Sequence, residues 1–235
     1  MNTGIISREK KGGFTLLELL IVIAIIAILS VALILVINPA ETLRKSRDAQ
    51  RISDMNTMKT ALGLYLTSTT TPYLGSVTAN TACKATPTTA YGTTGATVKL
   101  FYSLPTGAGT ISDTILDGSS ITTPASQVAT PSLTDGTGWI PVNFDTLTGG
   151  SPISNLPVDP TNALVSPDTV SSITSASLMY RYACSITPLA FEIDAPLESI
   201  TYTQTENKLT SDGGNNSNFY EVGTNLKILG AGTDF

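Results

Sequence analysis

The sequence has no histidine and few charged residues. Asp, Glu, Lys and Arg make up 13% of its 235 residues, against about 25% in typical soluble domains. The lack of histidine excludes His-dependent catalysis and histidine metal ligands within this chain. Its two cysteines are too few for a four-cysteine zinc site or an iron–sulfur cluster. A formal net charge of −5 gives no electrostatic basis for binding nucleic acid.

No sequence motif points to catalysis. The chain contains no G-x-S-x-G nucleophile motif, no phosphate-binding P-loop and no H-E-x-x-H metalloprotease motif. Acidic residues gather at Glu192, Asp194 and Glu198, and we interpret them as a solvated acidic face. We therefore expect a protein that is not an enzyme and that needs no cofactor, apart from a calcium hypothesis considered below.

The longest apolar run covers residues 14–37 and contains one charged residue, Glu18. A run of this length can cross a bilayer as a helix, for which about 20 residues suffice. A cleaved secretory signal has a shorter apolar core, roughly 7–15 residues, and a small-residue cleavage site that is missing here. A plain membrane anchor would explain the length but not Glu18, because a charge at the centre of a bilayer costs about 2.5–3.5 kcal/mol.

Three basic residues, Arg8, Lys10 and Lys11, precede the apolar run. Positive charge beside a membrane span stays on the cytoplasmic side. We therefore expect a single-pass precursor in the cytoplasmic membrane, with the N-terminus inside and the rest of the chain exported.

The stretch KKGGFTLLEL at residues 10–19 resembles the class III signal of bacterial type IV pilins and pseudopilins. The resemblance implies that a prepilin peptidase cuts between Gly13 and Phe14 and methylates the new amine of Phe14. Residues 1–13 would then be a leader peptide, and residues 14–37 the transmembrane and assembly helix. The resemblance also makes Glu18 the residue that directs assembly.

Glu18 has a physical reason to act between subunits. Cleavage leaves a free cation at Phe14, about one helical turn from Glu18, and a carboxylate in lipid needs a charged or hydrogen-bonded partner. The Phe14 amine of a neighbouring subunit could be that partner when subunits stack. Alternatively, Glu18 snorkels to the inner interface, because it lies only four residues into the run.

Residues 38–66 are predicted to form a second, amphipathic helix that belongs to the head. Asn38-Pro39 should kink or open the helix, because proline lacks a backbone donor and clashes with the preceding turn. Apolar residues then recur at mostly three- and four-residue steps and predict one buried face: Leu43, Ile52, Met55, Met58, Leu62 and Leu66.

The same helix carries four basic residues: Arg44, Lys45, Arg47 and Arg51. We interpret them as a solvated face with local pairs to Glu41, Asp48 and Asp54. The alternative is contact with neighbouring subunits or lipid headgroups.

Residues 67–235 have the composition of an exported, β-rich head. Two threonine-rich, nearly uncharged zones suit exposed loops, and alternating segments predict short strands. The pattern predicts an α+β fold, in which a long N-terminal helix packs against an antiparallel sheet. The resemblance to type IV pilins implies the same plan. The zones are 67–97 and 106–137, and the strands are 98–104, 139–144, 178–184, 189–194, 219–222 and 226–229, of which 139–144 is the weakest because of Pro141.

Cys83 and Cys184 are most simply a disulfide, since an even pair of cysteines in an exported chain is usually bonded. The bond would tie the first threonine-rich zone to the strand predicted at 178–184. Two unpaired buried thiols are the alternative.

The polar loop at residues 211–218 carries oxygen-bearing side chains on a glycine turn. Asp212, Asn215 and Asn216 could contribute to a calcium site, and the loop loosely resembles the calcium loop of major pseudopilins of type II secretion. It lacks the EF-hand spacing, and a plain polar turn is the alternative.

Three functions fit these features. The resemblance implies a subunit that polymerises with its own copies into a type IV pilus for adhesion or motility. The alternatives are a pseudopilin of type II secretion or DNA uptake, and a membrane-tethered binding module that does not polymerise. The expected partners of a pilin are the prepilin peptidase and the assembly platform, and its fibre is extracellular or periplasmic. From Leu62 onward 5 Lys and Arg stand against 13 Asp and Glu, which disfavours direct nucleic-acid binding.

Overall fold

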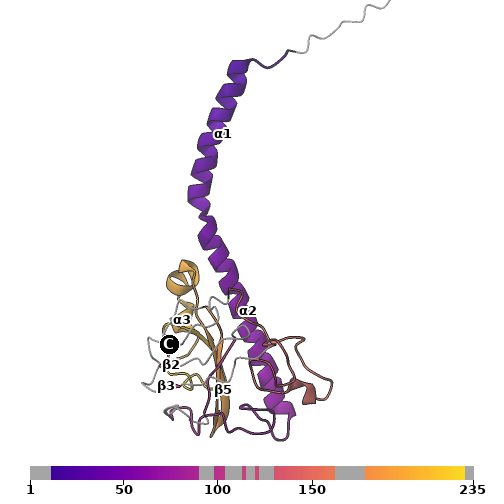
Figure 1. Cartoon of the computed structure of the whole chain (residues 1–235). Coiled ribbons are helices and arrows are strands. Elements are labelled where there is room, and N and C mark those ends of the chain that lie inside the picture. Colours follow the sequence, from indigo (N-terminus) through magenta and orange to yellow (C-terminus); the bar gives the residue numbers. More distant parts are fainter. Residues whose placement is uncertain are drawn as a thin grey trace, which may run out of the picture. The chain divides into compact units, whose positions relative to one another are not determined.

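The computed structural model describes residues 12–89, 98–103, 113–114, 120–121, 130–161 and 178–230. The chain divides into two units, Met1–Thr42 and Leu43–Phe235 (Figure 1). The first unit contains the predicted span, and the second contains the head. The basic residues predicted to set the orientation, and most of the leader, lie outside the described residues.

The first unit contains helix α1, Leu16–Ile37. Between residues 16 and 34 its apolar side chains are exposed, from Leu16 at 82% to Ile21 at 48%. Within the described residues one helical stretch is long and apolar enough to cross a membrane. The helix ends at Asn38, whose backbone is left-handed with φ 43°. Asparagine tolerates this conformation, and Pro39 follows. The predicted break at Asn38-Pro39 is confirmed.

Helix α2, Pro39–Ser68, carries the head on one face. Met55, Met58 and Leu62 are fully buried, together with Ala61 and Tyr65. Their three- and four-residue spacing places them on one stripe, so this part of the predicted amphipathic face is confirmed. Leu43 was expected on that face but is 61% exposed.

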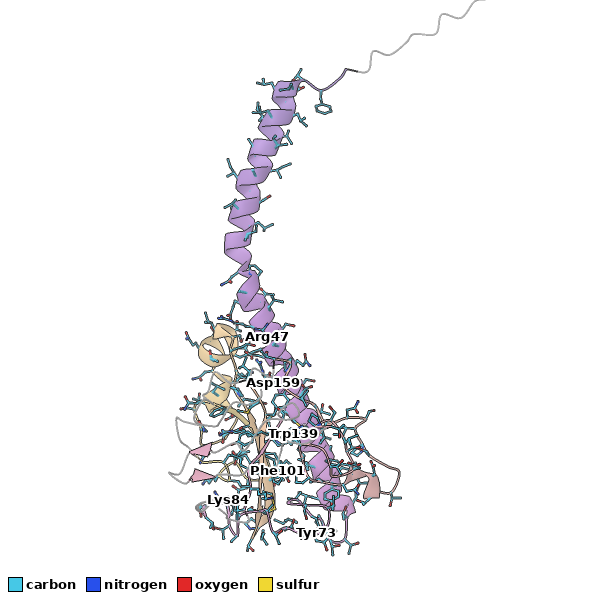
Figure 2. The ribbon with its side chains drawn as sticks, viewed as in Figure 1. Arg47, Tyr73, Lys84, Phe101, Trp139 and Asp159 are labelled. Atoms are coloured by element: carbon cyan, nitrogen blue, oxygen red, sulfur yellow. A yellow bond between two sulfur atoms is a disulfide. The ribbon has the colours of Figure 1, made fainter. Side chains whose placement is uncertain are left out.

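Four antiparallel strands form the sheet that α2 packs against, in the order β1-β4-β5-β6. Strands β4 and β5 make the central hairpin, with Cys184 opposite Phe191. The core lies between α2 and this sheet and includes Tyr180 and Phe191 together with Trp139, which Figure 2 labels. The predicted α+β fold is thus confirmed. The bounds are β1 Phe101–Tyr102, β4 Arg181–Ile186, β5 Leu189–Ala195 and β6 Tyr220–Gly223; β2 Asp113–Thr114 and β3 Ser120–Ile121 pair separately.

The strand predicted at 139–144 is wrong. Trp139 and Phe144 are fully buried, but the segment makes a single bridge, between Asp135 and Asn143. It then enters the short 3-10 helix η1, Phe144–Thr146. Pro141 has no backbone donor for a ladder. The segment is held by individual bonds instead, such as Trp139 Nε1–H to the Pro157 carbonyl at 2.8 Å.

The predicted disulfide is confirmed. Cys83 and Cys184 are bonded, with their Cα atoms 4.7 Å apart. Beside the bond, Lys84 N–H donates to the Cys184 carbonyl at 2.8 Å, and Ile186 N–H donates to the Lys84 carbonyl at 2.8 Å. The first threonine-rich zone is therefore joined to β4 both covalently and through the backbone.

Replacing both cysteines by serine should lower the free energy of unfolding by about 2–5 kcal/mol, because the bond closes a chain segment of 101 residues. Urea unfolding of the full chain in detergent micelles can follow the single tryptophan, Trp139, which is fully buried. An unchanged urea midpoint would show that the disulfide does not stabilise the head.

Candidate functional site

The predicted processing site lies just before α1. Around Gly13 no atom approaches the position that a Cβ would take, and Phe14 is 89% exposed. Within the described chain, the bond between Gly13 and Phe14 is therefore open to an enzyme.

Glu18 makes hydrogen bonds at the start of α1. Its Oε2 accepts from Thr15 N–H and from Thr15 Oγ1–H, both at 2.8 Å. In return, Glu18 N–H donates to Thr15 Oγ1 at 3.2 Å. This reciprocal capping box satisfies backbone donors that the first turn of a helix leaves free. A T-x-x-E pattern at residues 15–18 could have indicated it.

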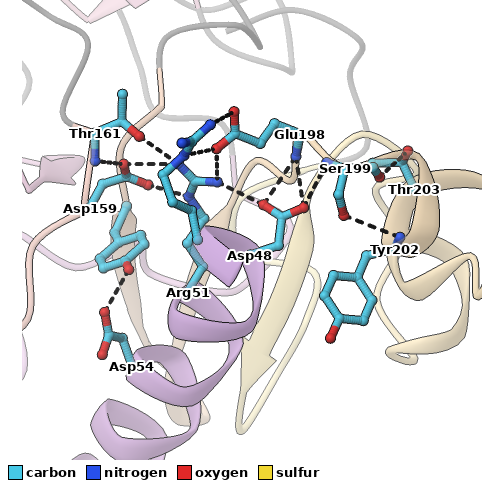
Figure 3. Close-up of polar contacts among 11 residues, drawn as sticks. Asp48, Arg51, Asp54, Asp159, Thr161, Glu198, Ser199, Tyr202 and Thr203 are labelled. Carbon is cyan, nitrogen blue, oxygen red and sulfur yellow. Dashed lines mark hydrogen bonds and ion pairs between the residues drawn. The ribbon is translucent and has the colours of Figure 1, made fainter. Parts of the chain in front are cut away.

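In the head, a polar cluster surrounds Arg51, whose side chain is fully buried (Figure 3). Arg51 Nε and Nη2 donate to Asp159 at 2.7 and 3.2 Å, and Nη2 also donates to Thr161 at 3.1 Å. Nη1 donates to Asp48 at 2.7 Å and to Glu198 at 2.8 Å. All five N–H donors of the guanidinium are used, and they connect α2 to two separate loops.

Glu198 joins a second arginine to this cluster. Arg47 donates to it in a bidentate pair, with Nε at 2.6 Å from Oε1 and Nη2 at 2.7 Å from Oε2. The hydrogen bonds from Arg47, assisted by those from Arg51, lower the pKa of Glu198 to about 2. This ion pair therefore persists unless the pH falls well below 4.

These contacts correct the sequence interpretation of the basic residues. Arg51 is buried rather than solvated, and Asp48 is the one expected partner that it keeps. Asp54 instead accepts from the Tyr180 hydroxyl at 2.8 Å. The partners Asp159 and Glu198 lie more than a hundred residues away in the chain, so helical spacing could not have found them.

The acidic face predicted around Glu192 is also wrong. Glu192 and Asp194 are fully buried in β5. Asp194 pairs with Arg181, its neighbour across the hairpin, through Nε at 2.7 Å and through Nη2. Burial raises the pKa of Asp194, while Arg181 opposes that rise.

Glu192 holds the segment that follows β6. Its Oε2 accepts from Ile228 N–H at 2.6 Å and from Leu229 N–H at 2.8 Å, while buried Lys84 donates to the Ile228 carbonyl at 2.9 Å. The strand predicted at 226–229 is therefore wrong: these residues form turns, because side chains rather than a neighbouring strand satisfy the backbone.

Glu192 also faces a second carboxyl group, that of Glu221 in β6. Burial, followed by the hydrogen bond and charge of Glu221, raises the pKa of Glu192 well above its usual value. Within the described residues, Glu192 Oε1 has no donor. A proton on Glu192 resolves this, since the carboxyl group can then donate to the Glu221 carboxylate.

The three residues of the calcium hypothesis lie in one loop, but the side-chain oxygens of two of them, Asp212 and Asn216, accept from the backbone. Asp212 accepts from Gly214 N–H at 3.0 Å and from Glu221 N–H at 2.7 Å. Asn216 Oδ1 accepts from Asn218 N–H at 2.9 Å. Asn215 is exposed. In the described part of the chain, no three acidic, cysteine or histidine side chains gather to hold a metal, and calcium binding here stays an untested hypothesis.

The comparisons with known proteins bear on the N-terminus. Residues 8–34 match the family described as the prokaryotic N-terminal methylation motif. This is the class III signal predicted from the KKGGFTLLEL stretch, and it includes Gly13, Phe14 and Glu18. No curated protein and no solved structure gave a significant match.

Replacing Arg51 by Met should lower the free energy of unfolding by about 3–5 kcal/mol, because it leaves buried carboxylates without their partner. Arg51→Lys, which keeps the charge but not the five-donor fork, should recover only part of the loss. Trp139 fluorescence during urea unfolding measures both. Exposed Lys59→Gln on the same helix is the control and should stay within about 0.5 kcal/mol of the wild type. Equal effects of Arg51→Met and Lys59→Gln would contradict the role of the cluster.

The raised pKa of Glu192 predicts how stability depends on pH. The folded chain keeps a proton that the unfolded chain releases near pH 4.5, so this group's stabilisation is complete below that pH and is lost as the pH rises. Glu192→Gln can accept from both backbone donors and donate to Glu221 without titrating. Its free energy of unfolding should therefore fall less than that of the wild type between pH 5 and pH 8.

Two comparisons make this test decisive. Glu192→Ala removes the acceptor for Ile228 and Leu229 and should be destabilised throughout that pH range. Glu198, with its pKa of about 2, loses its stabilisation only as the pH falls below 4.5, outside this window. Identical pH slopes for the wild type and Glu192→Gln would refute the shared proton.

Proposed function

We propose that this chain, which carries the class III signal of type IV pilins and pseudopilins, is a subunit of a type IV pilus or pilus-like fibre. One observation supports the proposal above all. The matched motif occupies residues 8–34 and coincides with an exposed apolar helix that carries a single charge near its start. The signal is typical of structural proteins rather than enzymes.

Processing would begin at the membrane. The basic residues before α1 would keep the N-terminus in the cytoplasm, and α1 would hold the precursor in the bilayer. A prepilin peptidase would cut between Gly13 and Phe14 and methylate the Phe14 amine. The exposure of Phe14 suits such an enzyme.

Assembly follows from the surface of α1. The most apolar part of this helical stretch is not buried against the rest of the chain. Its side chains therefore need contact with lipid before assembly and with other copies of the chain afterwards. Within the described residues, Glu18 accepts hydrogen bonds at Oε2 and not at Oε1, and both donors belong to Thr15. Oε1 can therefore accept from the Phe14 amine of a neighbouring copy while the cap remains.

A pseudopilin of type II secretion or DNA uptake would use the same signal and the same α1. It differs in where the fibre stands: a pilus extends from the cell surface, whereas a pseudopilin fibre stays within the envelope. The excess of acidic residues in the head makes direct DNA capture unfavourable.

Glu18→Gln should abolish or strongly reduce filaments without disturbing the subunit. Glutamine is the other residue that suits the third position of a capping box, so the variant keeps the cap and loses only the charge. We expect it to be inserted, cleaved and disulfide-bonded. Electron microscopy of cells counts filaments, and mass spectrometry should find an N-terminus at Phe14 with one added methyl group.

Ser30→Ala is the matched control, because it also removes a polar side chain from α1. The Ser30 hydroxyl donates to the Ile26 carbonyl of the same helix. The variant should assemble normally. Wild-type filament numbers in Glu18→Gln cells would disprove charge pairing, whereas a mature wild-type chain that still starts at Met1 would disprove the processing step.

A further inference from the structure

Basic, aromatic and apolar side chains meet at one end of the head. Arg44 and Lys45 come from the second turn of α2, and Ile200 and Tyr202 come from the turn that contains η3, the π-helical Thr201–Thr205. We call these four residues the Ile200 patch. Lys45 Nζ lies 5.8 Å from the centroid of the Tyr202 ring, within the range of a cation–π contact.

The Arg51 cluster places this turn on α2. The Asp48 carboxylate accepts from Glu198 N–H at 3.1 Å and from Ser199 N–H at 2.7 Å (Figure 3). Ser199 in turn accepts at its Oγ from Tyr202 N–H, at 3.3 Å, and at its carbonyl from Thr203. These backbone and side-chain polar groups at the start of the turn are thus bonded within the head, while Ile200 is left 50% exposed.

The charges of the patch are available for an external partner. Arg47 and Arg51 are neutralised by carboxylates. Among the described residues, no ion pair involves Arg44 or Lys45, and both are exposed. From Leu62 onward the head carries a net negative charge, so Arg44 and Lys45 form a local positive charge on it.

Chain length limits what the patch can reach. Arg44 follows Ile37, the last residue of α1, by seven residues, so it lies at most about 25 Å from it along the chain. Headgroups extend the bilayer from about 30 Å of hydrocarbon to about 40–45 Å in all. With α1 in the membrane, Arg44 and Lys45 lie within reach of the headgroups on the exported side.

We propose that the Ile200 patch binds the surface of the membrane that α1 spans. Arg44 and Lys45 would bind anionic headgroups, and Ile200 and the Tyr202 ring would enter the interface, where amphipathic aromatic rings are favoured. The patch would dock the head of the unassembled subunit on the bilayer. This inference rests on the proposed membrane insertion of α1.

Photo-crosslinking tests the proposal in the full chain. The protein is reconstituted into phosphatidylcholine vesicles with or without phosphatidylglycerol, with a benzoylphenylalanine at position 200. A second sample carries the same probe at position 186, where Ile186 is 44% exposed at the end of β4. We expect lipid adducts at position 200 that increase with phosphatidylglycerol, and few at position 186.

Charge variants test the headgroup contact. The double variant Arg44→Gln with Lys45→Gln should reduce the phosphatidylglycerol-dependent adducts at position 200 at least fivefold, since each cation near an anionic surface contributes roughly fivefold. Lys59→Gln, further along the same helix, should not reduce them. Disulfide formation in each variant shows that the head has folded.

Four outcomes would overturn the proposal. Equal lipid adducts at positions 200 and 186 would mean non-specific contact. Adducts to a second copy of the chain, in place of lipid, would assign the patch to a subunit interface. A protein that fails to float with vesicles would refute membrane insertion itself, and with it the precursor step of the proposed function. A protein that floats but gives no lipid adduct at position 200 would refute only membrane binding by the Ile200 patch.

Discussion

The head depends on the hydrogen bonds of one buried guanidinium. From Met55 onward, α2 is held to the sheet by apolar side chains. Between Leu43 and Met55 no α2 residue belongs to the apolar core, and polar contacts take over. Arg51 joins α2 to Asp159 in one loop and Glu198 in another. A buried charge needs a full set of partners to be tolerated, so the acceptors of the five donors must be in place when Arg51 is buried. That requirement fixes both loops against one turn of the helix, and with them the turn that carries Ile200.

A second group of buried ionisable residues fixes the segment that follows β6 in the same manner. Glu192 and Lys84 hold opposite sides of the peptide group between Ile228 and Leu229: Glu192 accepts from Leu229 N–H, and Lys84 donates to the Ile228 carbonyl. Next to them, Gly214 permits a close approach, because a Cβ there would lie 1.8 Å from Glu221 Oε2. The chain has few charged residues, and many of those in the head are used inside it, where a low dielectric strengthens each contact. Stability should therefore respond to pH from two sides, through Glu198 in acid and Glu192 at higher pH.

Features with local causes could be predicted from the sequence. Helix α1, the break at Asn38 and strand β5 follow from the apolar pattern and from proline, and the disulfide follows from the even cysteine pair in a chain expected to be exported. The Arg51 cluster and the Glu192 contacts could not be predicted, because their partners are separated by 108 to 147 residues and by 36 to 37 residues. The segment at 139–144 is a second case in which contacts distant in sequence decided the structure. Its apolar residues are buried, but Pro141 and bonds to distant carbonyls decided its backbone. At the N-terminus, the signal and the T-x-x-E pattern behind the cap of Glu18 and Thr15 are both local features of the sequence.

That cap changes how a carboxylate in the membrane can be understood. An isolated charge in the first turns of a lipid-exposed helix would be costly, yet Oε2 of Glu18 is bonded to Thr15 within its own chain. The cap also satisfies a backbone N–H at Thr15, which lipid could not do. The bonds use one oxygen and leave the net charge in place. On the proposed function, the subunit can therefore remain in the bilayer at reduced cost and still gain from a cation. On the proposed function, the cation is the amine that cleavage creates one residue before Thr15. Before cleavage that position is a neutral peptide group, so the charge of Glu18 acquires its partner only in processed copies.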